Sequence, residues 1–236
     1  MNPIDLKQGS AAWLAERTGK CTGSRVKDAL SFGKAGEPSA ARHKYAVELI
    51  CERLTTQSSH HFVTEAMAWG QEMEKLARAA YEERTNNEVD LVGIALHPLI
   101  KNFAASPDGF LGSDGIVEFK CPMTATHVRW MLEGVVPREH VPQLYAEMSC
   151  SKRRYVDFVS FDPRLPARFQ LFIKRLDYAD EPVELMENGV VLFLSETDEL
   201  MKRMCELNPP LESDADTDPN PYGDLGILKS DIPSFA

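Results

Sequence analysis

The chain has 236 residues, 43% of them hydrophobic, so it is long enough to bury a substantial core. Its apolar runs fall far short of the roughly 20 residues that span a bilayer, and its N-terminal segment lacks the basic start and apolar stretch of a secretory signal. The formal net charge of -10 argues at first sight against a nucleic-acid partner, although residues 212–224 alone hold five acids and no base.

Four helices are predicted in the first half of the chain. Ser10, Thr22 and Ser39 each precede a helical stretch, and their hydroxyl groups can accept hydrogen bonds from the free N–H groups at a helix N-terminus. The predicted helices comprise residues 11–17, 24–32, 40–54 and 64–85. In the last of these, apolar residues recur at helical spacing and predict a buried face: Trp69, Met73, Leu76 and Ala80.

From residue 89 onward the apolar period becomes alternating, which is typical of strands. The predicted strands comprise residues 89–96, 102–106, 108–111, 115–120, 153–163 and 168–176, with a hairpin turn at 112–115. Further helices are predicted at 124–133, from Pro137 through residue 150, and from about Asp180 to Leu207. This order predicts an α/β fold in which helices flank a mixed sheet. We expect one domain, residues 1–207, and an acidic, proline-rich tail, residues 208–236.

The segment "SPDGFLGSDGIVEFKCP", residues 106–122, carries the most informative chemistry. Alternate side chains of a strand share a face, so Glu118 and Lys120 are neighbours while Val117 and Phe119 point into the core. The hairpin would bring Asp108 beside Glu118, and two such carboxylates repel unless a proton or a divalent cation lies between them. Taken singly, E-x-K is usually a solvated strand face and "SPDG" a type I turn. Together they form the pattern of the PD-(D/E)XK nuclease core.

Several other segments occur in the order found in phage lambda exonuclease and its viral recombinase relatives. They are "WLAERTGKCTGSRV", "AMAWGQEMEKLAR", "HVPQLYAEM" and "FVSFDP". The chain therefore resembles the YqaJ-type alkaline exonucleases of the PD-(D/E)XK superfamily over residues up to about 205. This resemblance implies a restriction-endonuclease-like core, with a central mixed sheet flanked by helices.

The resemblance also implies a metal site. Asp108, Glu118 and the main-chain carbonyl of Phe119 correspond to the ligands of a first Mg²⁺, and Glu74 to the acid that completes a two-metal site. Mn²⁺ is expected to substitute. Lys120 corresponds to the catalytic lysine, which would hold the attacking water or the charge that develops on the phosphate.

Contacts with DNA follow from the same resemblance. Gln143 corresponds to a glutamine that orients the attacking water or a phosphate, and Met67 to an apolar wedge that splits the terminal base pair. A 5′-phosphate pocket is implied at four residues: Arg17, Thr22, Ser24 and Lys34. Thr22 and Ser24 lie at a predicted helix N-terminus, where free N–H groups attract phosphate, although plain N-capping is the alternative reading.

The implied activity is that of a Mg²⁺-dependent exonuclease that degrades one strand of linear duplex DNA from its 5′ end and leaves a 3′ overhang. Implied partners are duplex ends, a single-strand annealing protein and two further copies of the chain in a trimeric ring, with no membrane. Alternatives are an endonuclease or single-strand-specific nuclease of the same core, or a non-catalytic DNA-end-binding module. The five cysteines form no C-x-x-C pair, which favours the cytoplasm.

Overall fold

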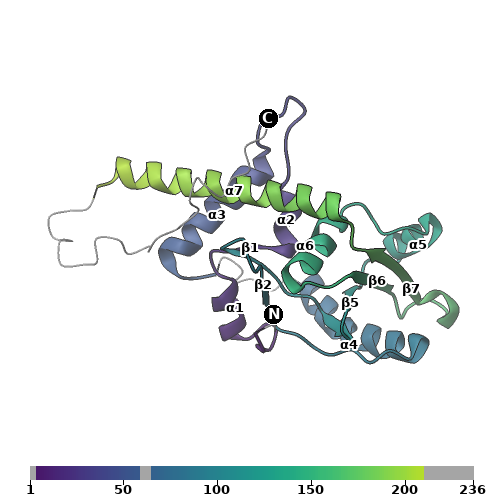
Figure 1. Ribbon diagram of the computed structural model, residues 1–236. Coiled ribbons are helices and arrows are strands. Elements are labelled where there is room, and N and C mark those ends of the chain that lie inside the picture. Colours follow the sequence, from purple (N-terminus) through teal and green to yellow (C-terminus); the bar gives the residue numbers. More distant parts are fainter. Residues whose placement is uncertain (1–3, 59–64, 210–236) are drawn as a thin grey trace.

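The computed structural model describes residues 4–58 and 65–209, except for the side chains of residues 65–68 and 71 (Figure 1). Most of the predicted acidic tail therefore lies outside the described residues. The mixed α/β architecture predicted from the order of elements is confirmed. Among the described residues, no helix combines the length and apolar composition needed to cross a bilayer.

The N-terminal region contains short elements that lead into one long helix. They are α1 (Ala11–Arg17), β1 (Cys21–Thr22), η1 (Gly23–Arg25), α2 (Val26–Ala29) and α3 (Ala40–Thr55). Ser10 and Ser39 accept hydrogen bonds from the backbone N–H of Trp13 and Arg42, as their predicted capping role requires. The predicted cap at Thr22 is wrong, because this residue ends a strand and its side chain makes no capping bond.

Helix α4 (Glu65–Thr85) forms as predicted, but its buried stripe matches the predicted one only at Met73 and, partly, at Ala80. Met73, Ala77 and Tyr81 enter the core at i, i+4 and i+8, whereas Trp69 and Leu76 remain 37% and 50% exposed. The Tyr81 hydroxyl donates a 2.7 Å hydrogen bond to Asp157 Oδ2 in the sheet. Packing against the strands selects a narrower face than the helical periodicity alone predicts.

In the part of the chain that the structure describes, seven strands form two sheets. Their bounds are β1 as above, β2 (Ala95–Leu96), β3 (Phe103–Ala105), β4 (Gly109–Leu111), β5 (Gly115–Lys120), β6 (Tyr155–Phe161) and β7 (Leu171–Asp177). The smaller sheet has the order β1-β3-β2 and the larger β4-β5-β6-β7. The predicted hairpin joins β4 and β5 in antiparallel pairing, while β5 and β6 run parallel.

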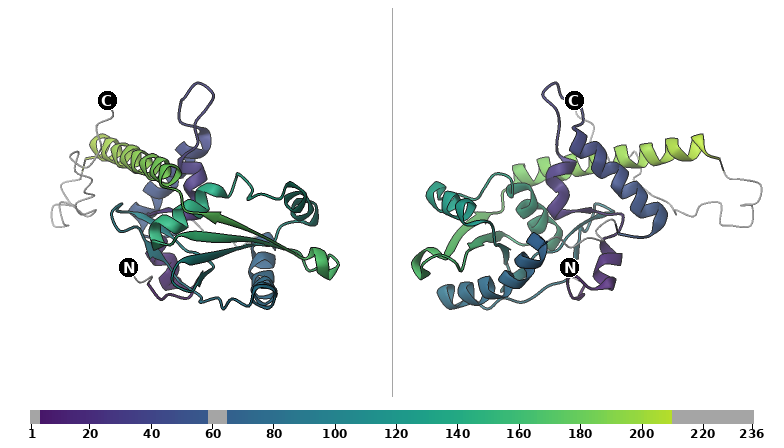
Figure 2. Two further views of the ribbon diagram at one scale, coloured as in Figure 1. Left: turned by 45° about the vertical axis from the view of Figure 1, so that its right-hand side comes forward. Right: turned by 180° about the vertical axis from the view of Figure 1, so that it is seen from behind.

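Both faces of the larger sheet are covered (Figure 2). On one face Val117 and Phe119 pack with α4 residues Ala77 and Tyr81. The other face is covered by α5 (Thr124–Glu133) and α6 (Val141–Ser151), where a second apolar cluster forms: Ile116, Trp130, Leu144, Met148 and Phe158. Glu118 lies on this second face and is only 3% exposed, so E-x-K is not a solvated strand face here.

Of the two later helices, one begins at a different residue from the predicted one and the other has the predicted bounds. Helix α6 begins at Val141 and not at Pro137, because the residues after Pro137 form a turn in which the His140 N–H donates to the Pro137 carbonyl. Helix α7 (Asp180–Leu207) has the predicted bounds. It lies along α3 (Figure 1), where the rings of Tyr45 and Phe193 stack with centroids 5.1 Å apart in a third apolar cluster.

Candidate active site

The β4–β5 hairpin brings the first two predicted acids together. Gly109 pairs with Val117, so Asp108 stands opposite Glu118 in the antiparallel register. The Oδ2 atom of Asp108 accepts a 2.7 Å hydrogen bond from the Phe119 backbone N–H. This bond fixes the carboxylate at the end of the hairpin, next to the strand that carries Glu118.

The Oε1 atom of Glu118 is the centre of a polar network. It accepts hydrogen bonds from Lys120 Nζ at 2.6 Å and from Gln143 Nε2 at 2.6 Å. The same Gln143 nitrogen donates a 2.8 Å bond to Glu147 Oε1, one turn further along α6. Within the described part of the chain, the buried second oxygens of Glu118 and Glu147 have no hydrogen-bond partner.

Burial and mutual repulsion perturb the acids of this network. The pKa of Asp108 is raised well above its ordinary value, first by burial and then by the charges of Glu118 and Glu74. Burial followed by the charge of Glu118 also raises the pKa of Glu74 and, more strongly, that of Glu147. Helix α4 therefore places Glu74 where the charge of Glu118 acts on it, while its predicted role as a metal ligand stays a prediction.

Lys120 balances part of this negative charge. Burial lowers the pKa of its ammonium group, but the attraction of Glu118 and Asp108 outweighs burial and raises the pKa overall. Against one lysine the network holds four carboxyl groups, so its formal charge with all groups ionised is about −3. Such an excess of hard oxygen donors suits a divalent cation.

Hydrogen bonds hold these acids in the present arrangement. Taking residues 4–58 and 65–209 alone, no group of three or more Asp, Glu, His or Cys side chains has the spacing of a complete metal site. The ammonium of Lys120 and the amide of Gln143 instead satisfy Glu118 Oε1. The predicted ligand role of the Phe119 carbonyl stays a prediction; Phe119 itself contacts Asp108 through its N–H and packs its ring in the core.

The predicted 5′-phosphate residues are only partly brought together. Arg17 and Thr22 line one small pocket, which also contains Lys20 and Arg25. The Arg17 guanidinium lies 4.3 Å from the Trp13 ring centroid and donates a 3.0 Å bond to Ser106 Oγ. The acid Glu52 also lines the pocket, and Lys20 and Arg25 form ion pairs with neighbouring acids. The Thr22 N–H is already bonded to the Tyr45 hydroxyl at 3.0 Å.

Three other predicted contacts lie outside this pocket. Ser24 is exposed in η1, and Lys34 is exposed in the loop between α2 and α3. The side chain of Met67, the predicted wedge, lies outside the described residues. Trp69, one half-turn further along α4, is partly exposed, and the Arg164 guanidinium lies 5.5 Å from its ring centroid.

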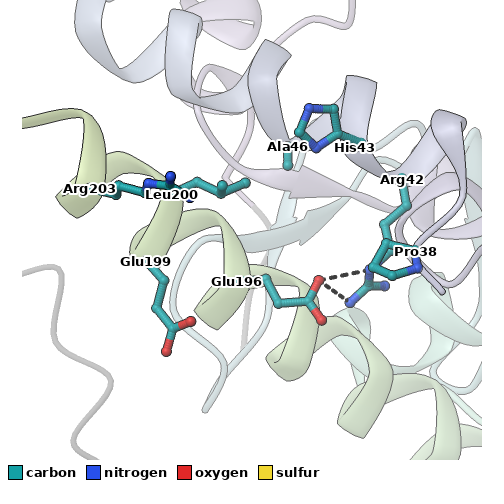
Figure 3. Close-up of a pocket in the computed structure, with 8 residues that line it drawn as sticks. All are labelled: Pro38, Arg42, His43, Ala46, Glu196, Glu199, Leu200 and Arg203. Carbon is teal, nitrogen blue, oxygen red and sulfur yellow. Dashed lines mark hydrogen bonds and ion pairs between the residues drawn. The ribbon is translucent and has the colours of Figure 1, made fainter. Parts of the chain in front are cut away.

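A larger cavity of about 350 Å³ lies away from the acids, between α3 and α7 (Figure 3). The buried Arg42 forms an ion pair with the partly exposed Glu196 at its edge, with Arg42 Nη2 2.8 Å from Glu196 Oε2. None of the predicted site residues is among those that line it. The cavity therefore gives no reason to move the candidate site away from Asp108 and Glu118.

Glu147 is a residue that the sequence analysis did not select. It is 1% exposed, bonded to Gln143, and repelled by Glu118. Its spacing of four residues from Gln143 in a helix was the available signal, because side chains at i and i+4 are neighbours. The same spacing occurs on solvent-facing helix surfaces, so it does not by itself indicate a site.

Comparisons with known proteins indicate the family of the chain. The model of the YqaJ-like viral recombinase domain matches residues 12–154. The alkaline exonuclease LHK-Exo from Laribacter hongkongensis is 38% identical, with a TM-score of 0.77, and the match covers 84% of this chain and 97% of that chain. LHK-Exo in complex with dAMP gives 37% identity and a TM-score of 0.78 over the same shares. No curated protein sequence matches.

A phage-related exonuclease from Haemophilus somnus 129PT has a TM-score of 0.61 at 13% identity, over 78% of this chain and 96% of that chain, and so supports the fold alone. The neighbours share the lambda-exonuclease-like PD-(D/E)XK fold, which confirms the predicted fold class. The family supports a nuclease role on DNA. The chain belongs to the YqaJ-like viral recombinase family, as its resemblance to phage lambda exonuclease predicted.

Proposed function

We propose that the protein is a Mg²⁺-dependent exonuclease that degrades one strand of linear duplex DNA in the 5′ to 3′ direction, releasing mononucleotides and leaving 3′ overhangs. The observation that carries the proposal is the convergence of Asp108 and Glu118 with Lys120 and Gln143 at the β4–β5 hairpin. The family membership and the dAMP complex of LHK-Exo support the same activity class and product.

The residues fit a divalent metal site. Glu118 Oε2 is buried without a hydrogen-bond partner among the described residues, which supports a cation site. Burial, followed by the charges of Glu118 and Glu74, raises the pKa of Asp108 in the same place. Asp108, Glu118, Glu74 and the carbonyl of Phe119 would hold two Mg²⁺ ions, or Mn²⁺ in their place. A bound divalent ion would polarise the scissile phosphate and lower the pKa of bound water.

The chain's own side chains supply the remaining chemistry. Lys120 keeps its proton because Glu118 and Asp108 raise the pKa of its ammonium group against the opposing effect of burial. Its ammonium group would therefore donate hydrogen bonds to the phosphate and stabilise its negative charge, instead of removing a proton from the attacking water. Gln143 lies within hydrogen-bond distance of Glu118 and is available to orient water beside the acids.

The direction of digestion would come from the N-terminal pocket. Arg17 and Thr22 share this pocket with Lys20 and Arg25, and an arginine can bind a terminal phosphate through two parallel hydrogen bonds. Ser24 and Lys34 would contact the DNA backbone outside the pocket, because exposed side chains can reach phosphate groups on the surface of the duplex. Met67 would act as the wedge at the terminal base pair.

The proposed setting is phage-type recombination in the cytoplasm. The 3′ overhang would pass to a single-strand annealing protein, and three copies of the chain would surround the duplex as a ring. Confinement in a ring would let DNA meet inward basic side chains despite the formal net charge of -10. Sedimentation of the protein alone and with a short duplex would test the number of copies.

Digestion of a linear duplex labelled separately at each end tests the activity. A 5′-phosphorylated strand should release its 5′-terminal label first, as a mononucleotide, and faster than its 5′-hydroxyl twin. Covalently closed circular duplex should resist; its cleavage would indicate an endonuclease of the same core. Binding of ends without hydrolysis would indicate a non-catalytic module. Glu118→Ala should lose hydrolysis, whereas Glu184→Ala, at an exposed position on α7, should retain it.

A further inference from the structure

Helix α6 directs two polar side chains toward the acids, and they contact each other. Gln143 and Glu147 lie one turn apart, and Gln143 Nε2 donates to Glu147 Oε1 at 2.8 Å. The same nitrogen donates to Glu118 Oε1 at 2.6 Å. The Gln143 nitrogen therefore lies between two carboxylates that come from different elements, α6 and β5.

A carboxamide has two N–H donors on its nitrogen and accepts hydrogen bonds only at its oxygen. In this structure both donors of Gln143 are used by Glu118 and Glu147. We propose that Glu147 is a positioning residue, which fixes the Gln143 carboxamide so that its oxygen acts as the acceptor that orients the attacking water. Gln143 is then unable to donate to a phosphate. This inference rests on the proposed nuclease function.

The position of Glu147 is explained by this role better than by a contribution to stability. Its neighbours Leu144 and Met148 on α6 are completely buried in the apolar cluster against the sheet. A buried carboxylate is costly unless it is paired, and Glu147 Oε2 lacks a hydrogen-bond partner among residues 4–58 and 65–209. Lys120 offsets part of its charge at longer range. A leucine would pack at this position at lower cost, but it would leave one N–H of Gln143 unbonded.

Glu147→Gln tests the inference because it preserves the shape of the side chain and removes the obligate acceptor. Gln143 could then turn its amide over, so kcat for duplex digestion should fall about 10- to 100-fold while KM for DNA stays unchanged. The Mg²⁺ concentration for half-maximal activity should also stay unchanged. Glu184→Gln, the same change at an exposed position, is the matched control.

A double-mutant cycle distinguishes positioning from other roles. In a Gln143→Ala background, Glu147→Gln should cause no further loss of kcat, because the group that it positions is gone. If Glu147→Gln lowers kcat by the same factor in the wild type and in Gln143→Ala, the inference is overturned. So would a weaker affinity for Mn²⁺ alone, measured by electron paramagnetic resonance, since that result would make Glu147 a metal ligand.

A second readout does not depend on activity. In the metal-free wild-type protein labelled with ¹⁵N, the side-chain N–H₂ signal of Gln143, identified by its loss in Gln143→Ala, should exchange slowly with solvent. The signal should shift and exchange faster in Glu147→Gln, or in Glu147→Asp if the first variant fails to fold. Fast exchange in the wild type would overturn the inference even if the enzyme digests DNA. If the Gln143 amide exchanges slowly but the protein does not digest DNA, the proposed function is overturned and the inference on Glu147 is not.

Discussion

Arg17 donates a hydrogen bond from Nη1 to Ser106 Oγ at 3.0 Å, and Ser106 stands two positions before Asp108. A basic side chain at the end of α1 thus contacts the same short segment that carries a proposed metal ligand. The N-terminal pocket and the acids are therefore connected through the short segment between Ser106 and Asp108. A terminal phosphate bound at Arg17 would enter beside the acids.

Arg17→Ala should reduce kcat/KM on 5′-phosphorylated duplex by about 10- to 100-fold, since a hydrogen bond between charged groups contributes about 1.5–3 kcal/mol. Activity on the 5′-hydroxyl duplex should change little. Steady-state digestion of the two substrates measures the difference, with exposed Lys44→Ala as the control. Equal losses on both substrates would mean that Arg17 acts through Ser106 on Asp108 and not on the phosphate.

Metal binding should stabilise the folded protein and depend on Glu118. At a Mg²⁺ concentration of about 100 times Kd, binding adds about 2.7 kcal/mol, which raises Tm by about 5–10 °C for a domain of this size. Chelation with EDTA should remove both this shift and the digestion of DNA. Glu118→Gln should show no Mg²⁺-dependent change in Tm. A shift of wild-type size in that variant would place the metal elsewhere.

Asp108 should make the metal-free protein less stable as pH rises. Burial, followed by repulsion from Glu118 and Glu74, raises the pKa of this carboxyl well above its ordinary value. The folded state then binds more protons than the unfolded state, so the free energy of unfolding falls from about pH 4 up through the raised pKa. Each pKa unit of difference contributes about 1.4 kcal/mol.

Urea denaturation in EDTA across this pH range measures the effect. Asp108→Asn should show a smaller decrease in unfolding free energy with pH than the wild type, whereas the exposed change Glu184→Gln should follow the wild type. Parallel curves for Asp108→Asn and the wild type would show that Asp108 is not the group whose burial is costly.

The contact between α3 and α7 should contribute strongly to stability. Phe193 is completely buried and stacks on Tyr45. Phe193→Ala should lower the free energy of unfolding by about 3–5 kcal/mol, because it removes a large apolar side chain and leaves a cavity. Leu185→Ala, at a position 66% exposed on the same helix, should change it by less than about 0.5 kcal/mol. Chemical denaturation compares the two, and similar losses would contradict the structure.

The sequence predicted those parts of the fold that local chemistry decides. Ser10 and Ser39 cap their helices through hydrogen bonds three residues away, and α5 ends before Gly134, whose φ of +65° suits glycine. Two of the wrong predictions depend on distant partners. Thr22 belongs to a strand because β1 pairs with β3, more than 80 residues away in sequence, and the buried stripe of α4 is selected by the sheet.

In the candidate site too, local features were predictable and features that depend on long-range packing were not. Strand alternation and a tight hairpin were enough to bring Asp108 beside Glu118 and Lys120, because both are short-range features. Glu147 was missed because its burial results from the packing of Leu144 and Met148 on β5 and β6. The sequence alone does not indicate whether an acid one turn after a glutamine is buried or exposed.

Helix α6 contributes side chains to two apolar clusters of the molecule. Leu144 and Met148 belong to the apolar cluster beside the larger sheet, while Ala146 and Cys150 belong to the cluster beneath α3 and α7. Gln143 and Glu147 occupy its remaining side. Residues 141–151 therefore contribute to two apolar clusters and to the candidate site at once, so exchanging this helix for a foreign one would disturb folding and chemistry together.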